Sequence, residues 1–148
     1  MAREGEFERV FERLKGIIEP YGRQLHVMAG DARNYGVDMA PEGQRDPTTW
    51  FAGARINKRY VSYYLMPVYV EPALVEGISP ALRRRMQGKC CFNFTVVDDV
   101  LFAELAELTR RGFDRTGGDP GWGVARRQER GMAHRKAMSG SVGEGRNG

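Results

Sequence analysis

The chain has 148 residues, 41% of them hydrophobic, which is enough for one domain with a core of its own. It contains no run of about 18 apolar residues, so the sequence predicts no membrane-spanning helix and no membrane partner. Its first residues, MAREGEFERVFERLKG, are charged throughout and lack the apolar core of a secretory signal. We therefore expect a cytoplasmic protein.

The net charge of +4 is concentrated near the C-terminal end of the chain. Beyond Phe113, seven cations are set against four acids, which accounts for three of the four excess charges. The body before Phe113 is close to neutral. Its overall charge therefore indicates no basic folded groove, and a nucleic-acid partner is not favoured.

The N-terminal part predicts one helix and two short strands. Residues 4–18 carry apolar side chains at three- and four-residue spacing, which is typical of an amphipathic helix that Pro20 would end. Residues 24–29 alternate apolar and polar side chains, and 34–38 form a return strand after a turn. Residues 39–46 are rich in proline and glycine and are predicted to be a loop.

The longest run of strand-forming residues, 50–70, predicts two strands around a tight turn. Asn57-Lys58 is the expected two-residue turn, because asparagine tolerates the positive φ that such turns need. The resulting cross-strand pairs form an apolar core face, namely Ile56/Arg59, Ala54/Val61, Ala52/Tyr63 and Trp50/Leu65. The opposite, polar face carries Phe51, Gly53, Arg55, Tyr60, Ser62, Tyr64 and Met66. A slip of one residue would exchange the two faces on one strand.

A short helix and a strand follow. Ser79 is the expected cap of a helix over 80–86, whose three arginines, Arg83 to Arg85, form either a solvated helix surface or an anion site. Residues 89–96 predict a strand. Its inward side chains are Cys90, Phe92, Phe94 and Val96, and its outward ones are Lys89, Cys91, Asn93 and Thr95.

The last predicted element is a long helix that Asp98 caps and that Gly112 ends in the left-handed conformation. Residues 114–148 are rich in glycine and show no sustained apolar period. We therefore predict a single α+β domain over 1–113, followed by a glycine-rich basic tail over 114–148 that is disordered.

The polar face of the 50–70 hairpin is the best candidate binding site. Its Arg55, Tyr60 and Tyr64 would lie beside outward residues of the 89–96 strand, namely Lys89, Cys91 and Asn93. Together they would line a shallow pocket for a small anionic or amphiphilic molecule, or contact a protein partner. The alternative is that a helix or loop covers this face and that its rings are ordinary core.

The only cysteines, Cys90 and Cys91, are adjacent on a strand and point to opposite faces, which predicts two free thiols. No motif for phosphate binding or hydrolysis occurs, and no cofactor or metal site is predicted. A nucleophilic Cys91 would need a base, and His26 on the polar side of its strand is a conceivable partner.

Three segments together resemble the YdhG-like family of bacterial domains of unknown function: KRYVSYYLMPVYV (58–70), EGISPALRRRMQGKCCFNF (76–94) and DDVLFAELAELTRRGF (98–113). The resemblance covers roughly residues 4–113. It implies a compact α+β domain with a curved, mostly antiparallel sheet and helices packed against it. One branch of that family is described as a frataxin-like iron chaperone, a role that would need a cluster of carboxylates for a hard cation.

The predicted function is therefore a non-enzymatic cytoplasmic domain that binds a small molecule or a protein, with a homodimer left open. Two alternatives remain at this point: an intracellular iron-binding chaperone of the frataxin-like type, and a thiol-dependent enzyme that uses Cys91.

Overall fold

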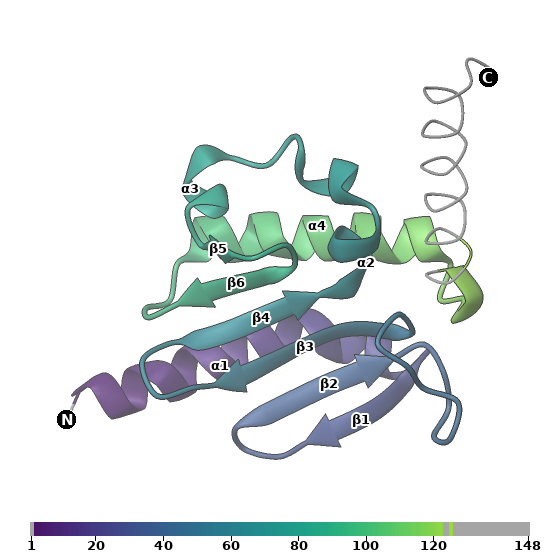
Figure 1. The fold of residues 1–148 in the computed structure, drawn as a ribbon. Coiled ribbons are helices and arrows are strands. Elements are labelled where there is room, and N and C mark those ends of the chain that lie inside the picture. Colours follow the sequence, from purple (N-terminus) through teal and green to yellow (C-terminus); the bar gives the residue numbers. More distant parts are fainter. Residues whose placement is uncertain (1, 123–124, 126–148) are drawn as a thin grey trace, which may run out of the picture.

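The computed structural model describes residues 2–122 and residue 125, and it places two long helices against one face of a six-stranded sheet (Figure 1). The helices are α1 (Ala2–Gly22), α2 (Met66–Val70), the 3-10 helix η1 (Pro72–Val75), α3 (Pro80–Arg83) and α4 (Asp99–Thr116). The strands are β1 (His26–Gly30), β2 (Asn34–Asp38), β3 (Trp50–Ile56), β4 (Val61–Leu65), β5 (Met86–Gln87) and β6 (Cys91–Phe94). Within the described residues, none of the helices combines the length and the apolar composition that a membrane crossing requires.

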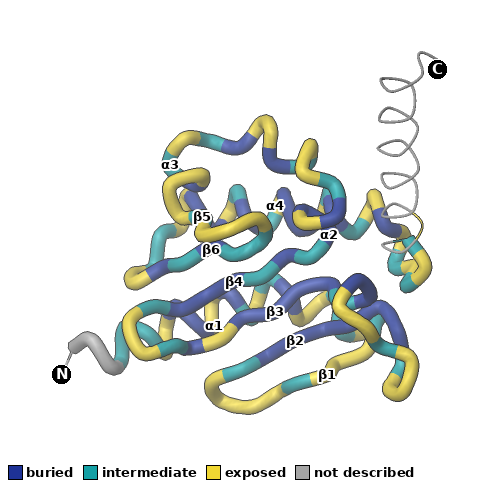
Figure 2. The backbone as a smooth tube through the Cα atoms, viewed as in Figure 1, coloured by how far each residue is buried: buried dark blue, intermediate teal, exposed yellow. Residues whose placement is uncertain are grey.

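The sheet is open and entirely antiparallel, with strand order β1-β2-β3-β4-β6-β5. The predicted α+β class is therefore confirmed. Exposed residues gather on the edge strand β1 and on the turns, whereas β3 and β4 are mostly buried (Figure 2). The candidate hairpin thus lies at the centre of the sheet.

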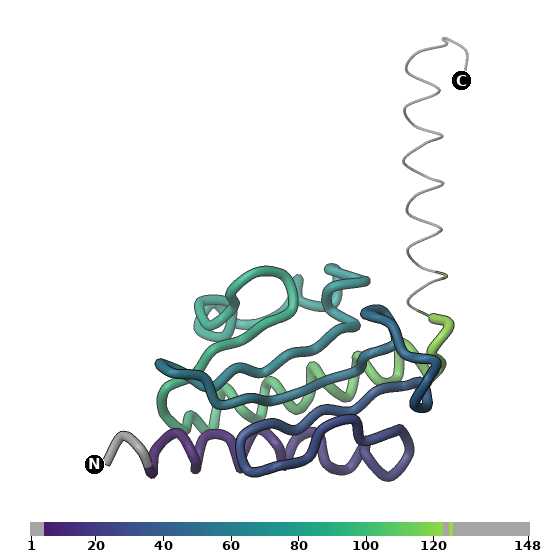
Figure 3. Tube along the Cα trace, turned by 60° about the horizontal axis from the view of Figure 1, so that its bottom comes forward, coloured from purple at the N-terminus to yellow at the C-terminus, as the bar shows by residue number. Residues whose placement is uncertain are grey.

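The core lies between the sheet and the two long helices, which contact each other along one side of the sheet (Figure 3). The predicted apolar stripe of α4 is confirmed, since Leu101, Phe102, Leu105 and Leu108 are all buried. The Tyr63 hydroxyl of β4 hydrogen-bonds the Thr109 hydroxyl of α4 at 2.5 Å inside this core. The face of the sheet that packs against α1 and α4 therefore forms the hydrophobic core.

The helix α1 continues through Pro20 to Gly22, so the prediction that Pro20 ends it was wrong. The proline falls in the last turn, where its missing N–H removes only a bond close to the helix end. Continuation also carries Tyr21 into the core, where its ring packs 5.2 Å from Phe51 and 5.0 Å from Phe113. Tertiary packing outweighs the local preference here.

The helix α4 begins at the predicted cap, because the Asp98 carboxylate accepts a hydrogen bond from Leu101 N–H at 3.0 Å. Its predicted end was wrong. Gly112 is buried inside the helix, and a Cβ there would lie 3.3 Å from Cβ of Pro67. The left-handed cap is instead Gly117, with φ 64°. Gly112 thus serves a close helix contact rather than a helix end.

The β3–β4 hairpin turns at Lys58-Arg59 and not at Asn57-Lys58. Asn57 N–H donates to the Tyr60 carbonyl at 2.8 Å, and Ile56 pairs with Val61. The predicted pairs were therefore displaced by two residues along β4. Because side chains alternate with a period of two, this displacement leaves the faces of β4 as predicted.

A bulge in β3 exchanges the faces of Trp50 and Phe51. Val37 pairs with Ala52 and Asp38 with Trp50, so Phe51 is an extra residue in the ladder. Phe51 consequently turns into the core, fully buried, and Trp50 lies on the other face. The predicted positions of these two rings were wrong.

The predicted strand to Val70 was too long, because β4 ends at Leu65 and α2 follows at once. Pro67 explains the change, since it cannot donate to a central ladder but suits the first turn of a helix. The helix expected over 80–86 ends at Arg83, and the strand expected over 89–96 is limited to Cys91–Phe94. Ser79 is the predicted cap of α3, accepting from Leu82 N–H at 3.1 Å.

Candidate functional site

The candidate site lies on the face of the sheet that α1 and α4 do not cover, here termed the open face. Ladder pairing and alternation place two rows of residues across it. The first row is Arg55, Ser62, Asn93 and Arg85, and the second is Gly53, Tyr64, Cys91 and Gln87. The open face therefore combines residues from β3, β4 and β6 with the short strand at the sheet edge.

Four of the six predicted site residues meet on the open face: Arg55, Tyr64, Cys91 and Asn93. Tyr60 alternates onto the same side next to the hairpin turn, where its carbonyl accepts from Asn57 N–H. Lys89 was expected on a strand but lies in the turn between β5 and β6. Its ammonium group sits 5.8 Å from the centre of the Tyr69 ring of α2, away from the other five.

A chain of side-chain hydrogen bonds crosses the open face. Asn57 Nδ2 donates to Ser62 Oγ at 2.8 Å, and Ser62 Oγ donates to Asn93 Oδ1 at 2.8 Å. Asn93 Nδ2 then donates to Gln87 Oε1, and the Cys91 thiol also donates to Asn93 Oδ1, at 3.3 Å. The network fixes the positions of these polar groups before any ligand arrives. Of its members, Asn57, Ser62 and Gln87 were not predicted as site residues.

An aromatic platform lies beside the polar network. A Cβ on Gly53 would lie 2.9 Å from Trp50 Cζ2, and one on Gly36 would lie 3.6 Å from Trp50 Nε1. The indole therefore lies against the backbone of these two glycines. The Tyr64 ring is 5.4 Å away at an interplanar angle of 37°, and both rings are partly exposed. Among the described residues, the buried Trp50 Nε1 has no hydrogen-bond partner.

The cations around the open face have no acidic neighbours in sequence. Residues 47–70 and 77–97, which include β3 to β6, contain no aspartate or glutamate, and the acids Glu71 and Glu76 lie in the connection between these two segments. They carry seven cations: Arg55, Lys58, Arg59, Arg83, Arg84, Arg85 and Lys89. None of the seven forms an ion pair within the part of the chain that the structure describes. The segments that form β3 to β6 therefore carry a positive charge that no acid within them offsets.

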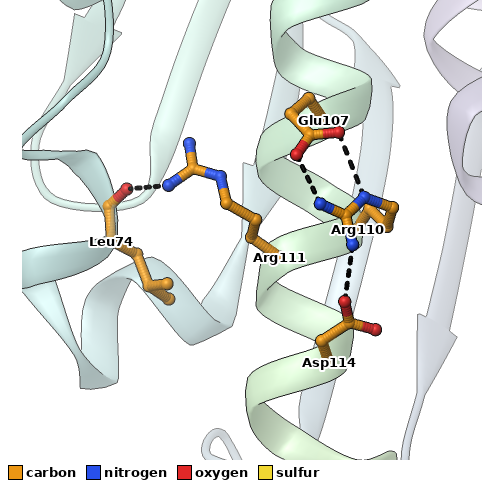
Figure 4. A network of polar contacts seen from close by, with 5 residues as sticks. All are labelled: Leu74, Glu107, Arg110, Arg111 and Asp114. Carbon is orange, nitrogen blue, oxygen red and sulfur yellow. Dashed lines mark hydrogen bonds and ion pairs between the residues drawn. The ribbon is translucent and has the colours of Figure 1, made fainter.

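The long helices show the opposite pattern, because their cations are paired. Arg110 binds both Glu107 and Asp114, as Figure 4 shows, and Arg13 reaches Asp99 at 2.6 Å. The neighbouring Arg111 donates to the Leu74 carbonyl at 3.4 Å. Charges are thus neutralised locally on the helices but not around the open face.

A groove of about 540 Å³ adjoins the open face at its Arg55 end. It is lined by Asp31, Ala32, Arg33, Asn34, Arg55 and Ile56. Asn34 pairs with Arg55 across β2 and β3, so the groove continues the first row of the open face. The Asp31 carboxylate accepts from Arg33 N–H at 2.8 Å. Two guanidinium groups in one groove suit a bidentate anion such as phosphate.

Both cysteines are free thiols, as predicted. Burial raises the pKa of the Cys91 thiol, an effect that hydrogen bonds from Ser62 and Tyr64 partly oppose. Burial also raises the pKa of Cys90, with a further contribution from Cys91. Because a nucleophilic cysteine needs a lowered pKa, neither thiol has the environment of an activated nucleophile.

The residues invoked for the two alternative functions do not come together in the structure. His26 lies on β1, which β2, β3 and β4 separate from β6, so the conceivable Cys91–His26 pair was wrong. In the part of the chain that the structure describes, no three His, Cys, Asp or Glu side chains gather in a way that could hold a metal ion. We therefore assign no residues to the iron-chaperone alternative.

Comparisons of the chain with family models, with curated proteins and with solved structures find no match. The YdhG-like resemblance therefore stays a prediction. The open face alone offers features that suit a binding function: its hydrogen-bond network, its aromatic platform and its cations, which have no ion pair among the described residues.

Proposed function

We propose that the protein is a cytoplasmic, non-enzymatic binding domain that takes an anionic ligand with a flat polar portion on the open face. The observation that carries the proposal is the pair Arg33 and Arg55 in the adjoining groove, neither in an ion pair among the described residues, beside an open face with two partly exposed rings. Positive charge concentrates anions near the surface, and aromatic rings offer area for planar groups.

Each part of the open face has a role in this proposal. Arg33 and Arg55 bind the anionic group in the adjoining groove, where a guanidinium can donate two parallel hydrogen bonds. Trp50 and Tyr64 contact the planar portion. The exposed Gln87, at the end of the hydrogen-bonded chain, offers amide N–H donors to polar atoms of the ligand. The cysteine thiols take no chemical part.

Thermal unfolding with adenosine monophosphate, adenosine and inorganic phosphate as probes tests the proposal. We expect adenosine monophosphate to raise the melting temperature more than either of the others, because only it combines a planar group with a phosphate. The double variant Arg33→Gln/Arg55→Gln should lose this rise. Arg9→Gln/Arg13→Gln, with the same loss of charge on α1, should keep it. A rise that is equal in both double variants, or absent in the unaltered protein, contradicts the proposal.

A further inference from the structure

We infer that the ligand of the open face is a single-stranded nucleic acid. The inference rests on the proposed function and names the class of its ligand. Averaged over the body, the charge is close to neutral and favours no such partner. The fold, however, gathers the acid-free segments 47–70 and 77–97 into neighbouring strands, whereas the acids of α1 and α4 lie in the helical layer. A phosphate backbone therefore meets cations on one side of the molecule.

The rings of the open face supply the second element of nucleic-acid recognition. Trp50 lies against Gly36 and Gly53, which leaves the outer face of the indole toward the ligand side, and Tyr64 is its neighbour on β4. Tyr60 lies two residues before Ser62, on the same face of the sheet, and is also partly exposed. Aromatic rings on a sheet stack nucleobases without regard to sequence, since every base has a flat π-face.

The dimensions of the face fit a short stretch of single strand. Arg55 and Arg85 end one row across β3, β4, β6 and β5, which is about 14 Å at roughly 4.8 Å for each step between strands. Sheets of this kind typically stack two or three bases. Between the two arginines lie Ser62 and Asn93, whose polar atoms suit contacts with base edges or sugar hydroxyls.

The geometry favours a single strand over a duplex. In a duplex the flat faces of the bases are hidden in the stack, so Trp50 and Tyr64 would find no ring to contact. Among the residues that the structure describes, no helix lies on the open face that could enter a major groove (Figure 1). Only a single-stranded nucleic acid whose bases are unstacked can contact the cations, the rings and the amides of the open face at the same time.

Fluorescence anisotropy of the full chain with a labelled 12-nucleotide oligouridylate tests the inference. We expect binding at least tenfold tighter than to a 12-base-pair RNA duplex, and an affinity that falls as salt rises. Arg55→Gln/Arg85→Gln should lower the slope of log affinity against log salt by about 1.4, which corresponds to two phosphate contacts. The matched control Arg9→Gln/Arg13→Gln should leave that slope unchanged.

A stacking variant separates recognition by the open face from attraction by charge alone. Tyr64→Leu should weaken oligouridylate binding about tenfold, since a stacked base depends on the ring. Tyr69→Leu, which removes an equally large exposed ring on α2, should leave binding unchanged. If Tyr64→Leu has no effect, or if heparin and duplex RNA bind as tightly as oligouridylate, the inference is overturned.

The two proposals can fail separately. If adenosine monophosphate raises the melting temperature through Arg33 and Arg55 but oligouridylate binds no more tightly than the mononucleotide, the nucleic-acid inference is wrong and the proposed function stands. If neither probe binds, both are wrong.

Discussion

The two faces of one sheet differ in what they contribute to the molecule, and β6 shows the difference within four residues. Phe92 and Phe94 are 0% and 2% exposed beneath the long helices, whereas Cys91 and Asn93 between them are partly exposed on the open face. One side buries rings, and the other side holds thiol, amide and hydroxyl groups in one network. Alternation along the strand thus separates the side chains that build the core from those to which the proposed function assigns ligand binding.

The same division holds for charge. A groove of about 650 Å³ runs between α1 and α4, and its two arginines, Arg13 and Arg110, already bind carboxylates. The groove beside Arg55 is smaller, but its arginines have no ion pair among the described residues. An anion would have to displace a carboxylate from each arginine on the helical side, whereas in the groove beside Arg55 the Asp31 carboxylate is hydrogen-bonded to the Arg33 N–H. Groove volume alone therefore does not identify the site.

The largest expected effect comes from the covered face. Phe92→Ala should lower the free energy of unfolding by about 3–5 kcal/mol, because a fully buried ring is replaced by a cavity. Gln87→Ala, on the exposed edge of the open face, should cost below about 1 kcal/mol. Urea unfolding followed by circular dichroism measures both. Equal losses in the two variants would contradict the division of roles.

Gly53 has no side chain, and this leaves the space above the backbone that the Trp50 indole occupies on the open face. In Gly53→Ala the new Cβ would lie 2.9 Å from Trp50 Cζ2 and 3.2 Å from the Tyr35 carbonyl oxygen. The indole must move, and we expect a loss of about 1–3 kcal/mol in unfolding free energy with a shift in tryptophan emission.

Gly16→Ala is the matched control for Gly53→Ala. A Cβ at Gly16 would have no atom within 4 Å, and the residue lies inside α1. Alanine should therefore stabilise the protein by about 0.5–1 kcal/mol with unchanged emission. A Gly53→Ala protein as stable as the unaltered chain would show that the indole does not need the bare backbone.

Much of this arrangement could be predicted from the sequence, because alternation and caps are local signals. The faces of Tyr64, Cys91 and Asn93 followed from a period of two, and Ser79 and Asp98 were recognised as caps. Even the displaced hairpin turn kept the faces of β4, since the displacement was by an even number of residues.

The features that could not be predicted from the sequence depend on contacts between residues that are far apart in the chain. The bulge that exchanges Trp50 and Phe51 is set by pairing with β2 and by the rings of Tyr21 and Phe113. The two-residue strand β5 is too short to leave a pattern, so Arg85 and Gln87 were not recognised as neighbours of Asn93. That the two acid-free segments, 47–70 and 77–97, lie side by side in the sheet emerged only when the strand order was known.

Ser62→Ala tests whether the network also supports the fold. Ser62 is 1% exposed, accepts from Asn57 and donates to Asn93, so its loss leaves two partners without a hydrogen bond. We expect a loss of about 1–2 kcal/mol in unfolding free energy. Thr95→Ala, at an exposed residue directly after β6, should change it by less than about 0.5 kcal/mol. Urea unfolding compares the two, and an equal change in both would show that the network contributes nothing to stability.

The smallest expected effect concerns the thiol at the centre of the network. The pKa of Cys91 is raised above its usual value of 9.0, mainly by burial. The Cys91 thiol therefore keeps its proton in the folded protein at a pH at which the same thiol loses it in the unfolded chain. The stability that this proton contributes is complete below pH 9.0 and decreases as the pH rises through and beyond that value.

Cys91→Ser should therefore lose less stability than the unaltered protein between pH 8 and pH 10, by a margin smaller than the effect of Ser62→Ala. Urea unfolding at a series of pH values measures this margin. Tyr63, whose pKa burial also raises, remains in both proteins and cancels in the comparison. Cys91→Ser also removes the Cys91 contribution to the raised pKa of Cys90, which changes the margin in the same direction. Identical pH profiles would mean that the Cys91 thiol is as well solvated in the folded protein as in the unfolded chain, and that the open face is more hydrated than its hydrogen bonds indicate.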